Sequence, residues 1–279
     1  MRLRRLGALA VALLIVASSL ALAGCAKSGG ASQTSLTVTG STTVLPIAEV
    51  AAEDFQTANP GKRVLVAGVG SSAGIESVSN GTSDIGTSSR DLKPEEKPLG
   101  LVDTKIALDA IAVIVNPSNP VSGLTKAQVS EIFQGKIKNW KDVGGPDLEI
   151  GLVNRDEASG TREAFSKFVL GTADFDPTAA VLPGTGQVRS VVAQAAGAVG
   201  YISLGFVDST VKALAVDGIP ANEKTVADGT YPLWRYLHFF TKGDPKGLAK
   251  AYIDYILSAD VQNTVVRDAG FLPITEGGK

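Results

Sequence analysis

The sequence is poor in the residues that carry most metal, redox and nucleophilic chemistry. Among its 279 residues there is one cysteine, Cys25, and one histidine, His238. A single cysteine excludes an intramolecular disulfide. With so few nitrogen and sulfur ligands, and with neither an HExxH nor a DxDxDG motif, the sequence predicts no metal site. No Walker phosphate loop is present either, so we expect no nucleotide and no cofactor.

Positive charge is also scarce once the N-terminus is set aside. The chain begins with Arg2, Arg4 and Arg5, followed by an almost wholly apolar run over residues 6–23. This pattern is typical of a secretory signal peptide, which we place at residues 1–24, whereas a transmembrane helix of this length would be marginally short. Without it the chain has 23 Lys and Arg against 28 Asp and Glu. This acidic balance disfavours nucleic acid or an anionic membrane surface as the main partner.

The single cysteine follows Leu-Ala-Gly at positions 22–24. This ending resembles the bacterial lipoprotein box, in which the cysteine becomes the first mature residue and is lipidated; an incidental cysteine in a signal peptide is the alternative. The small polar residues after Cys25 predict a lipidated, flexible tether over residues 25–35. We therefore expect a protein secreted across the cytoplasmic membrane and lipid-anchored on its outer face, in the periplasm or at the cell surface.

One pattern recurs along the rest of the chain: a short apolar strand, a turn rich in hydroxyl groups, and a helix with one apolar face. The predicted strands cover residues 36–39, 63–69, 84–86 and 148–153, and the second reads as a buried strand. After the second strand, residues 70–72 form the turn and the helix starts at Ile75; after the fourth, the helix ends at Gly171. Strands that alternate with helices are typical of an α/β fold with mostly parallel sheets. Further helices are predicted over residues 125–133, 186–197 and 245–257. The first of these opens with a capping-box pattern at Thr125 and Gln128.

The hydroxyl-rich turns all follow the carboxyl ends of strands, where ligands bind in open α/β sheets. Helix N-termini there offer unpaired N–H groups and the positive end of the helix dipole. A single Ser or Thr in such a turn is usually only an N-cap, but four turns together predict a pocket for a tetrahedral oxyanion. The hydroxyl donors are Ser41, Thr42, Thr43, Ser71, Ser159 and Thr161. Arg155 adds a bidentate, charge-assisted donor pair, and Asp156 or Glu157 either holds its guanidinium or is a solvated loop acid.

An enzymatic function competes for one of these turns. Residues 70–74, Gly-Ser-Ser-Ala-Gly, match the G-x-S-x-G nucleophile elbow between a strand and a helix. Ser72 would then be the nucleophile and His238 the base of a secreted serine hydrolase. However, His238 lies in an apolar run typical of a buried strand, and a hydrolase leaves the other three turns unexplained. We therefore expect a binding protein and not an enzyme.

Four stretches together resemble one family, the phosphate-binding lipoproteins and periplasmic proteins that feed the high-affinity phosphate ABC transporter. These stretches are GSTTVLPIAE (40–49), GVGSSAGI (68–75), SDIGTSSRDL (83–92) and NRDEASGTREAF (154–165). The resemblance covers residues 36–274 and implies the two-lobed α/β fold of type II periplasmic-binding proteins, with mixed, mostly parallel sheets. It implies a lobe I formed by residues 36–112 and 234–279, and a lobe II formed by residues 113–233.

By the same resemblance, the chain captures inorganic phosphate as a monomer and delivers it to the permease and ATPase subunits of an ABC transporter. The family's phosphate contacts carry over to Thr42, Thr43, Ser71, Arg155, Ser159, Gly160 and Thr161. One further site position departs from the pattern, because Ser89 stands where well-known members have an aspartate. An ionised acceptor accepts the phosphate proton and repels sulfate. Ser89 therefore leaves sulfate, molybdate or tungstate open as the ligand, and Arg90 either adds positive charge or only stabilises its loop.

Overall fold

The computed structural model describes residues 33–274. The predicted signal peptide, the lipidation site at Cys25 and most of the predicted tether lie outside these residues. The first strand begins at Ser35, the last residue of the predicted tether. Within residues 33–274, none of the helices has the length and apolar character that a membrane crossing requires.

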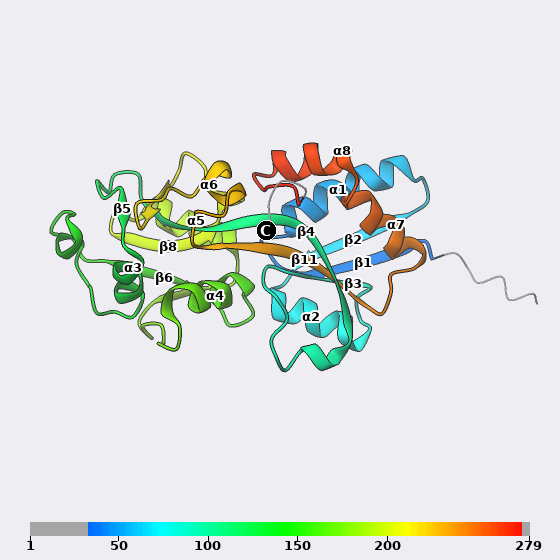
Figure 1. Ribbon diagram of the computed structural model, residues 1–279, viewed down its shortest axis with the longest axis horizontal. Coiled ribbons are helices and arrows are strands. Elements are labelled where there is room, and N and C mark those ends of the chain that lie inside the picture. The colour runs from blue at the N-terminus through cyan, green and yellow to red at the C-terminus, as the bar shows by residue number, and fades with distance from the viewer. Residues whose placement is uncertain (1–32, 275–279) are drawn as a thin grey trace, which may run out of the picture. The chain divides into compact units, whose positions relative to one another are not determined.

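A nine-stranded mixed sheet organises the described residues. Its strands are β1 (Ser35–Gly40), β2 (Arg63–Gly68), β3 (Ile85–Ser88), β4 (Leu101–Val115), β6 (Gly151–Arg155), β7 (Ala180–Leu182), β8 (Ala198–Ser203), β9 (Lys212–Ala213) and β11 (Trp234–Lys242). Their order is β2-β1-β3-β11-β4-β8-β6-β7, with β9 also paired to β4 (Figure 1). The pairs at both ends are parallel, and the pairs around β4 and β11 are antiparallel. The short strands β5 (Gly123–Leu124) and β10 (Ala215–Val216) form a separate parallel pair.

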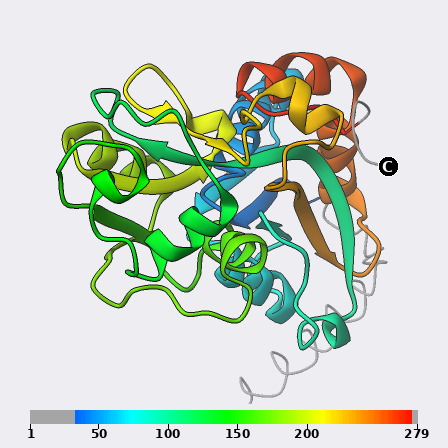
Figure 2. The same cartoon turned by 60° about the vertical axis from the view of Figure 1, so that its left-hand side comes forward.

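The longest strand, β4, joins the two ends of this sheet. Its residues 101–110 pair with β11, and its last residues, 111–115, pair with β8. Figure 2 shows the strong bend of β4 along its length. Because β11 pairs with β3 along its other edge, β4 and β11 together connect the N-terminal strands with β8, β6 and β7.

Helices cover the strands at both ends of the sheet. They are α1 (Leu45–Ala58), α2 (Ser71–Asn80), α3 (Lys126–Phe133), α4 (Gly160–Phe165), α5 (Thr185–Gln194), α6 (Glu223–Ala227), α7 (Gly247–Ile256) and α8 (Ala259–Val261). In Figure 1, α1 and α7 lie on one side of β1, β2 and β3, and α2 lies on the other. The predicted capping box is present, because Thr125 Oγ1 accepts from Gln128 N at 3.1 Å and Gln128 Oε1 accepts from Thr125 N at 2.8 Å.

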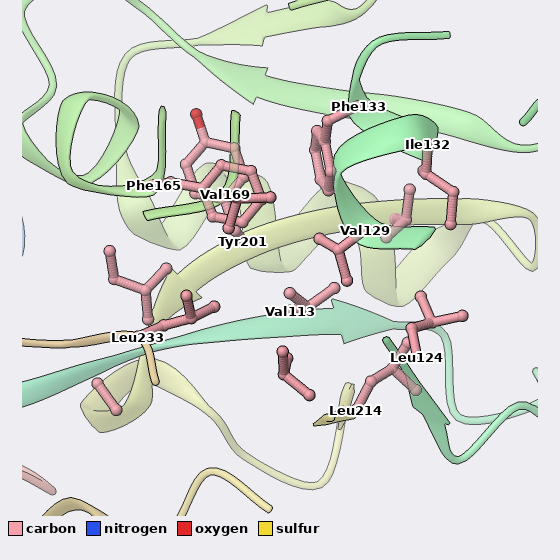
Figure 3. Close-up of a cluster of buried hydrophobic side chains, with 14 of the residues drawn as sticks. Val113, Leu124, Val129, Ile132, Phe133, Phe165, Val169, Tyr201, Leu214 and Leu233 are labelled. Carbon is pink, nitrogen blue, oxygen red and sulfur yellow. The ribbon is translucent and has the colours of Figure 1, made fainter. Parts of the chain in front are cut away.

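An aromatic cluster in the core fixes the end of β6. Phe165 of α4 stacks on Tyr201 of β8, with ring centroids 4.1 Å apart, and Phe133 of α3 meets both rings edge-on (Figure 3). Burial of side chains of this size contributes about 1.5–3 kcal/mol each. The Tyr201 hydroxyl donates to Asn154 Oδ1 and accepts from Arg155 N at 3.3 Å. The core therefore holds in place the strand end that carries Arg155.

Three local predictions differ from the structure. The strand predicted over residues 63–69 as buried is the edge strand β2, and Leu65 is 47% exposed because β2 has a partner on one side only. The strand predicted over residues 148–153 is shifted, so that Arg155 is the last residue of β6 and not part of the following turn. Helix α2 begins directly at Ser71 and not near Ile75, because Gly70 has a φ of +103° that few other residues adopt and so ends the extended backbone.

Candidate functional site

The hydroxyl-rich turns meet at the carboxyl ends of β1, β2, β3 and β6. Thr43 Oγ1 lies 3.1 Å from Thr161 Oγ1, although the two residues are 118 positions apart in the chain. Ser71 Oγ accepts from Ser89 N at 3.1 Å. A Cβ atom on Gly160 would clash with Ser71 Oγ and would lie 2.9 Å from Ser89 Oγ, so only glycine permits this approach. The structure therefore brings together the residues predicted for the site, namely Thr42, Thr43, Ser71, Ser89, Arg155, Ser159, Gly160 and Thr161.

The start of α4 supplies both side-chain and backbone groups to this cluster. Ser159 is the N-cap of α4, and its Oγ accepts from Arg162 N at 3.2 Å. The first amide groups of a helix have no acceptor within the helix, which leaves the N–H groups of Gly160 and Thr161 for another oxygen. The helix continues through residues 166–170 and ends at Gly171, as the sequence predicts. This segment therefore presents the donors that an anion requires at a helix N-terminus.

Arg155 is a buried cation whose partners are all uncharged. Its side chain is 2% exposed. Its Nε donates to Leu182 O at 3.1 Å, and its Nη2 donates to Pro183 O at 2.8 Å. Its Nη1 donates to Thr185 Oγ1 at 3.1 Å, and Nη2 also reaches Thr42 Oγ1 at 3.3 Å. Burial lowers the pKa of the Arg155 guanidinium, but arginine stays protonated in proteins, so the site keeps a positive charge.

Neither of the two acids that follow Arg155 holds its guanidinium. Among residues 33–274 no carboxylate accepts a hydrogen bond from the Arg155 side chain, and none lies within ion-pair distance of it. The side chain of Glu157 is 93% exposed, and its nearest cation is Arg162 at 4.0 Å. The solvated-loop alternative therefore holds for Glu157, and Asp156 influences Arg155 only through its nearby charge, which raises the arginine pKa.

Thr185 belongs to this cluster although the sequence-based prediction missed it. It is 1% exposed, and its Oγ1 lies 3.1 Å from Thr42 Oγ1 and 3.4 Å from Thr43 Oγ1. It is the first residue of α5 and follows β7 and Gly184. This is the same strand, turn and helix pattern as in the four predicted turns, so that pattern was the signal that could have identified Thr185.

A buried ion pair on the connecting strands also reaches the site. Arg235 of β11 and Asp109 of β4 lie directly opposite each other. Arg235 Nε and Nη2 donate to Asp109 Oδ2 at 3.0 and 2.8 Å, and Nη2 also donates to Thr161 Oγ1 at 3.0 Å. Burial raises the pKa of the Asp109 carboxyl, and Arg235 and a 2.6 Å hydrogen bond from Ser203 Oγ offset only part of this rise. The sequence showed this arginine only as part of an apolar strand.

Arg90 has carboxylate partners on two elements. Its guanidinium donates to both oxygens of Glu96 at 2.6 and 2.8 Å, and its Nε lies 2.8 Å from Glu163 Oε2 of α4. Its Nη2 also donates to Ser72 Oγ at 3.2 Å. These contacts neutralise Arg90 and tie its loop to α2 and α4, which favours the stabilising role over that of an additional positive charge.

The groups that a serine hydrolase would need are separated. Ser72 Oγ accepts from Arg90, whereas His238 Nδ1 lies 2.8 Å from Asp103 Oδ1. Within the described part of the chain no hydrogen bond joins Ser72 to His238. His238 and Arg235 instead line a cavity of about 630 Å³ between β11 and α4. The described residues contain no group of three or more His, Cys, Asp or Glu side chains arranged to hold a metal ion.

Comparison with known proteins identifies the family. A family model described as "PBP superfamily domain" matches residues 26–260. The phosphate-binding protein PstS of Bacillus subtilis (strain 168) is 40% identical over 248 residues, which cover 87% of this chain and 81% of that protein. The phosphate-binding protein PstS of Borreliella burgdorferi is 31% identical over 252 residues, which cover 86% and 90%.

Two solved structures of phosphate transport proteins are also similar to this chain. A candidate phosphate ABC transporter substrate-binding protein from Clostridium perfringens, solved with bound phosphate, has a TM-score of 0.83 and 38% identity, covering 86% of this chain and 99% of that one. An ABC-type phosphate transport receptor from Vibrio cholerae has a TM-score of 0.73 and 34% identity, covering 85% and 99%.

The chain therefore belongs to the PBP superfamily and, within it, to the family of the PstS phosphate-binding proteins. The family resemblance seen in four sequence motifs is confirmed, and so is the periplasmic-binding-protein fold with its mixed sheet. Membership of this family also makes the chain a substrate-binding protein of a transporter and not an enzyme.

Proposed function

We propose that this protein captures inorganic phosphate between two lobes outside the cytoplasmic membrane and delivers it to the permease and ATPase subunits of an ABC transporter. The observation that carries this proposal is Arg155, a buried cation surrounded by hydroxyl and carbonyl groups, to which no carboxylate of residues 33–274 is bonded. A buried charge is costly unless it is paired. An oxyanion is the partner that this set of donors suits.

The proposed phosphate ligands come from both lobes. Lobe I, at residues 36–112 and 234–279, contributes the hydroxyls of Thr42, Thr43, Ser71 and Ser89. Lobe II, at residues 113–233, contributes Arg155, Ser159, Gly160, Thr161 and, as an addition from the structure, Thr185. The change of partner within β4 after Ala110 supports a lobe boundary close to the proposed one. Because phosphate gains the full donor set only when both lobes contact it, its binding favours the closed state.

The lipid anchor forms the second part of the proposal. Signal cleavage after residue 24 would leave Cys25 as the lipidated N-terminus, followed by a tether over residues 25–35. A flexible chain of about ten residues spans roughly 18 Å, so the tether would keep the protein close to its permease, where we propose that it acts as a monomer. Metabolic labelling with radioactive palmitate tests this part. We expect label in the natural protein and its loss in a Cys25→Ser variant, whereas label retained in that variant would refute the anchor.

Equilibrium binding tests the ligand. The mature chain with Cys25→Ser is titrated in a calorimeter with phosphate, arsenate, sulfate and tungstate, and phosphate binding is then repeated under an excess of each competitor. We expect phosphate and arsenate to bind, and an excess of sulfate or tungstate to leave phosphate binding intact. Tighter binding of sulfate, molybdate or tungstate would replace phosphate by that oxyanion as the ligand. Covalent labelling of Ser72 by a fluorophosphonate, lost in His238→Ala, would instead indicate a hydrolase.

A further inference from the structure

We infer that Arg235, held by Asp109, sets the direction of the Thr161 hydroxyl, so that Thr161 presents its proton to the anion site. This inference rests on the proposed function, and it assigns a positioning role to an ion pair outside the predicted ligand set. The pair lies on the two strands that connect the lobes, β4 and β11. Arg235 is 5% exposed and Asp109 is 1% exposed, so their hydrogen bonds are shielded from bulk water.

The direction of the Thr161 hydroxyl follows from the chemistry of arginine. A guanidinium has five N–H donors and no acceptor. In the 3.0 Å contact between Arg235 Nη2 and Thr161 Oγ1, the hydroxyl oxygen must therefore accept. A hydroxyl carries a single proton, and that proton is left for another partner. Within the described structure the second partner of Thr161 Oγ1 is Thr43 Oγ1, 3.1 Å away, which belongs to the proposed phosphate ligands of the other lobe.

Asp109 keeps Arg235 in this position and neutralises its charge. It accepts from both Nε and Nη2, which fixes the plane of the guanidinium. Its second oxygen accepts from Ser203 Oγ at 2.6 Å, so the carboxylate is itself anchored to β8. The pair therefore adds no net charge to the site. Its contribution to anion binding is directional, in contrast with Arg155, which has no carboxylate bonded to it within the described part of the chain.

The direction of the Thr161 hydroxyl has a consequence for the protonation state of the ligand. Arg235 Nη2 occupies one of the two lone pairs of Thr161 Oγ1, so the hydroxyl proton and the second lone pair share the remaining directions. A hydroxyl proton that faces the anion biases this position toward a phosphate oxygen without a proton. Removal of the Arg235 donor lets the Thr161 hydroxyl rotate and accept from a P–OH group, so the preference for the less protonated form weakens.

A double-mutant cycle tests the inference. Phosphate affinity is measured by calorimetry for the natural residues, for Arg235→Met with Asp109→Asn, for Thr161→Val, and for all three substitutions together. The paired substitution removes both charges at once and avoids an unpaired buried carboxylate. We expect it to weaken phosphate binding about tenfold in the presence of Thr161, the scale of one charge-assisted hydrogen bond. In the Thr161→Val background we expect no further loss.

Two results would overturn the inference. An equal loss with and without Thr161 would mean that Arg235 contacts the anion directly or acts only on folding, and no loss in either background would mean that it does not act on the site. Thermal unfolding followed by circular dichroism checks that each variant folds. If the paired variant does not fold, Arg235→Lys takes its place, because the lysine keeps Asp109 paired but lacks the second planar N–H group that reaches Thr161.

The pH profile separates positioning from a general structural role. Phosphate affinity is measured on both sides of neutral pH for the natural protein and for the paired variant. We expect the natural protein to gain more affinity than the variant as the pH rises, whereas a structural defect would lower affinity equally at each pH. Failure of the natural protein to bind phosphate would refute the proposed function. Intact phosphate binding, with no coupling between the paired substitution and Thr161→Val, would refute this inference alone.

Discussion

Two arginines beside the site, Arg155 and Arg90, are buried to a similar degree and are surrounded in opposite ways. Their side chains are 2% and 4% exposed. Arg90 is bonded to both oxygens of Glu96 and also faces Glu163. Among the described residues, the Arg155 side chain is bonded only to carbonyl and hydroxyl oxygens. The carboxylates neutralise the charge of Arg90, whereas the neutral oxygens leave the charge of Arg155 available for an anion.

This difference explains how a protein with a net charge of −2 can attract an anion. The attraction depends on one uncompensated cation and on donors that face it, and the balance of surface charge contributes little. The two arginines are therefore expected to have different roles. Arg155 is expected to act mainly on binding, and Arg90 is expected to act mainly on stability.

The largest expected effect is that of Arg155→Ala on phosphate affinity. By analogy with truncation of one partner of a buried charge pair, the loss is about 2–5 kcal/mol. Calorimetric titration measures it. Arg189→Ala is the matched control, because Arg189 lies in the same predicted lobe, is about one-third exposed and is paired with Asp208 at 3.0 Å. Binding by Arg155→Ala that equals the control would remove Arg155 from the site.

Arg90→Met is expected to act on folding instead. It leaves Glu96, whose side chain is only 16% exposed, without its guanidinium partner. We expect a loss of about 2 kcal/mol in the free energy of unfolding, the scale of hydrogen bonds to a charged group, measured in urea. Lys141→Ala removes the exposed Lys141–Asp147 pair and should cost well under 1 kcal/mol. A loss of phosphate affinity in Arg90→Met as large as that of Arg155→Ala would contradict the separate roles of the two arginines.

Ser89→Asp places a carboxylate in the cluster that contains the uncompensated charge of Arg155. Ser89 is 1% exposed and lies against Ser71 and Gly160. An ionised side chain there can accept the phosphate proton and repels sulfate. We expect sulfate binding to fall about tenfold more than phosphate binding, a difference of about 1.4 kcal/mol. Ser89→Asn is the neutral control of the same shape; equal losses for both anions would show that this position does not set selectivity.

The smallest expected effect is a pH dependence of stability from Glu96. Burial acts to raise the pKa of this carboxyl, but hydrogen bonds from Arg90 and from Lys93 N outweigh it and the pKa is lowered. A lowered folded-state pKa means that the contribution to stability is present above the unfolded value of 4.5 and is lost as the pH falls through the folded value. The stability difference between the natural protein and Glu96→Gln should therefore shrink in acid. A difference that stays constant with pH would contradict this assignment.

The sequence predicted best those features that depend on near neighbours. The capping box at Thr125, the N-cap at Ser159 and the helix end at Gly171 are all set within a few residues. The turns that carry the site were also found, because a strand followed by hydroxyls and a helix is a local pattern. These features were sufficient to recognise the family and to select the candidate ligands.

The features that the sequence did not predict depend on distant partners. Whether β2 is buried or exposed depends on its place at the sheet edge, which its own residues do not encode. Arg235 reaches Thr161 across 74 positions and Asp109 across 126. The acids next to Arg155 in the sequence turned out not to bond to it, because its guanidinium points toward Leu182, Pro183 and Thr185.

The pairing of β3 with β11 has a consequence for the order of folding. Ser88 of β3 pairs with His238 of β11, and Tyr252 of α7 donates to Ala48 O of α1 across 204 positions. The N-terminal strands therefore acquire their last partner only when the C-terminal part of the chain is available. Until then β3 presents an open edge of the kind that favours aggregation, and contacts this distant slow folding. We expect residues 113–233, whose core is mostly internal, to fold first, and the N-terminal strands to complete their sheet last.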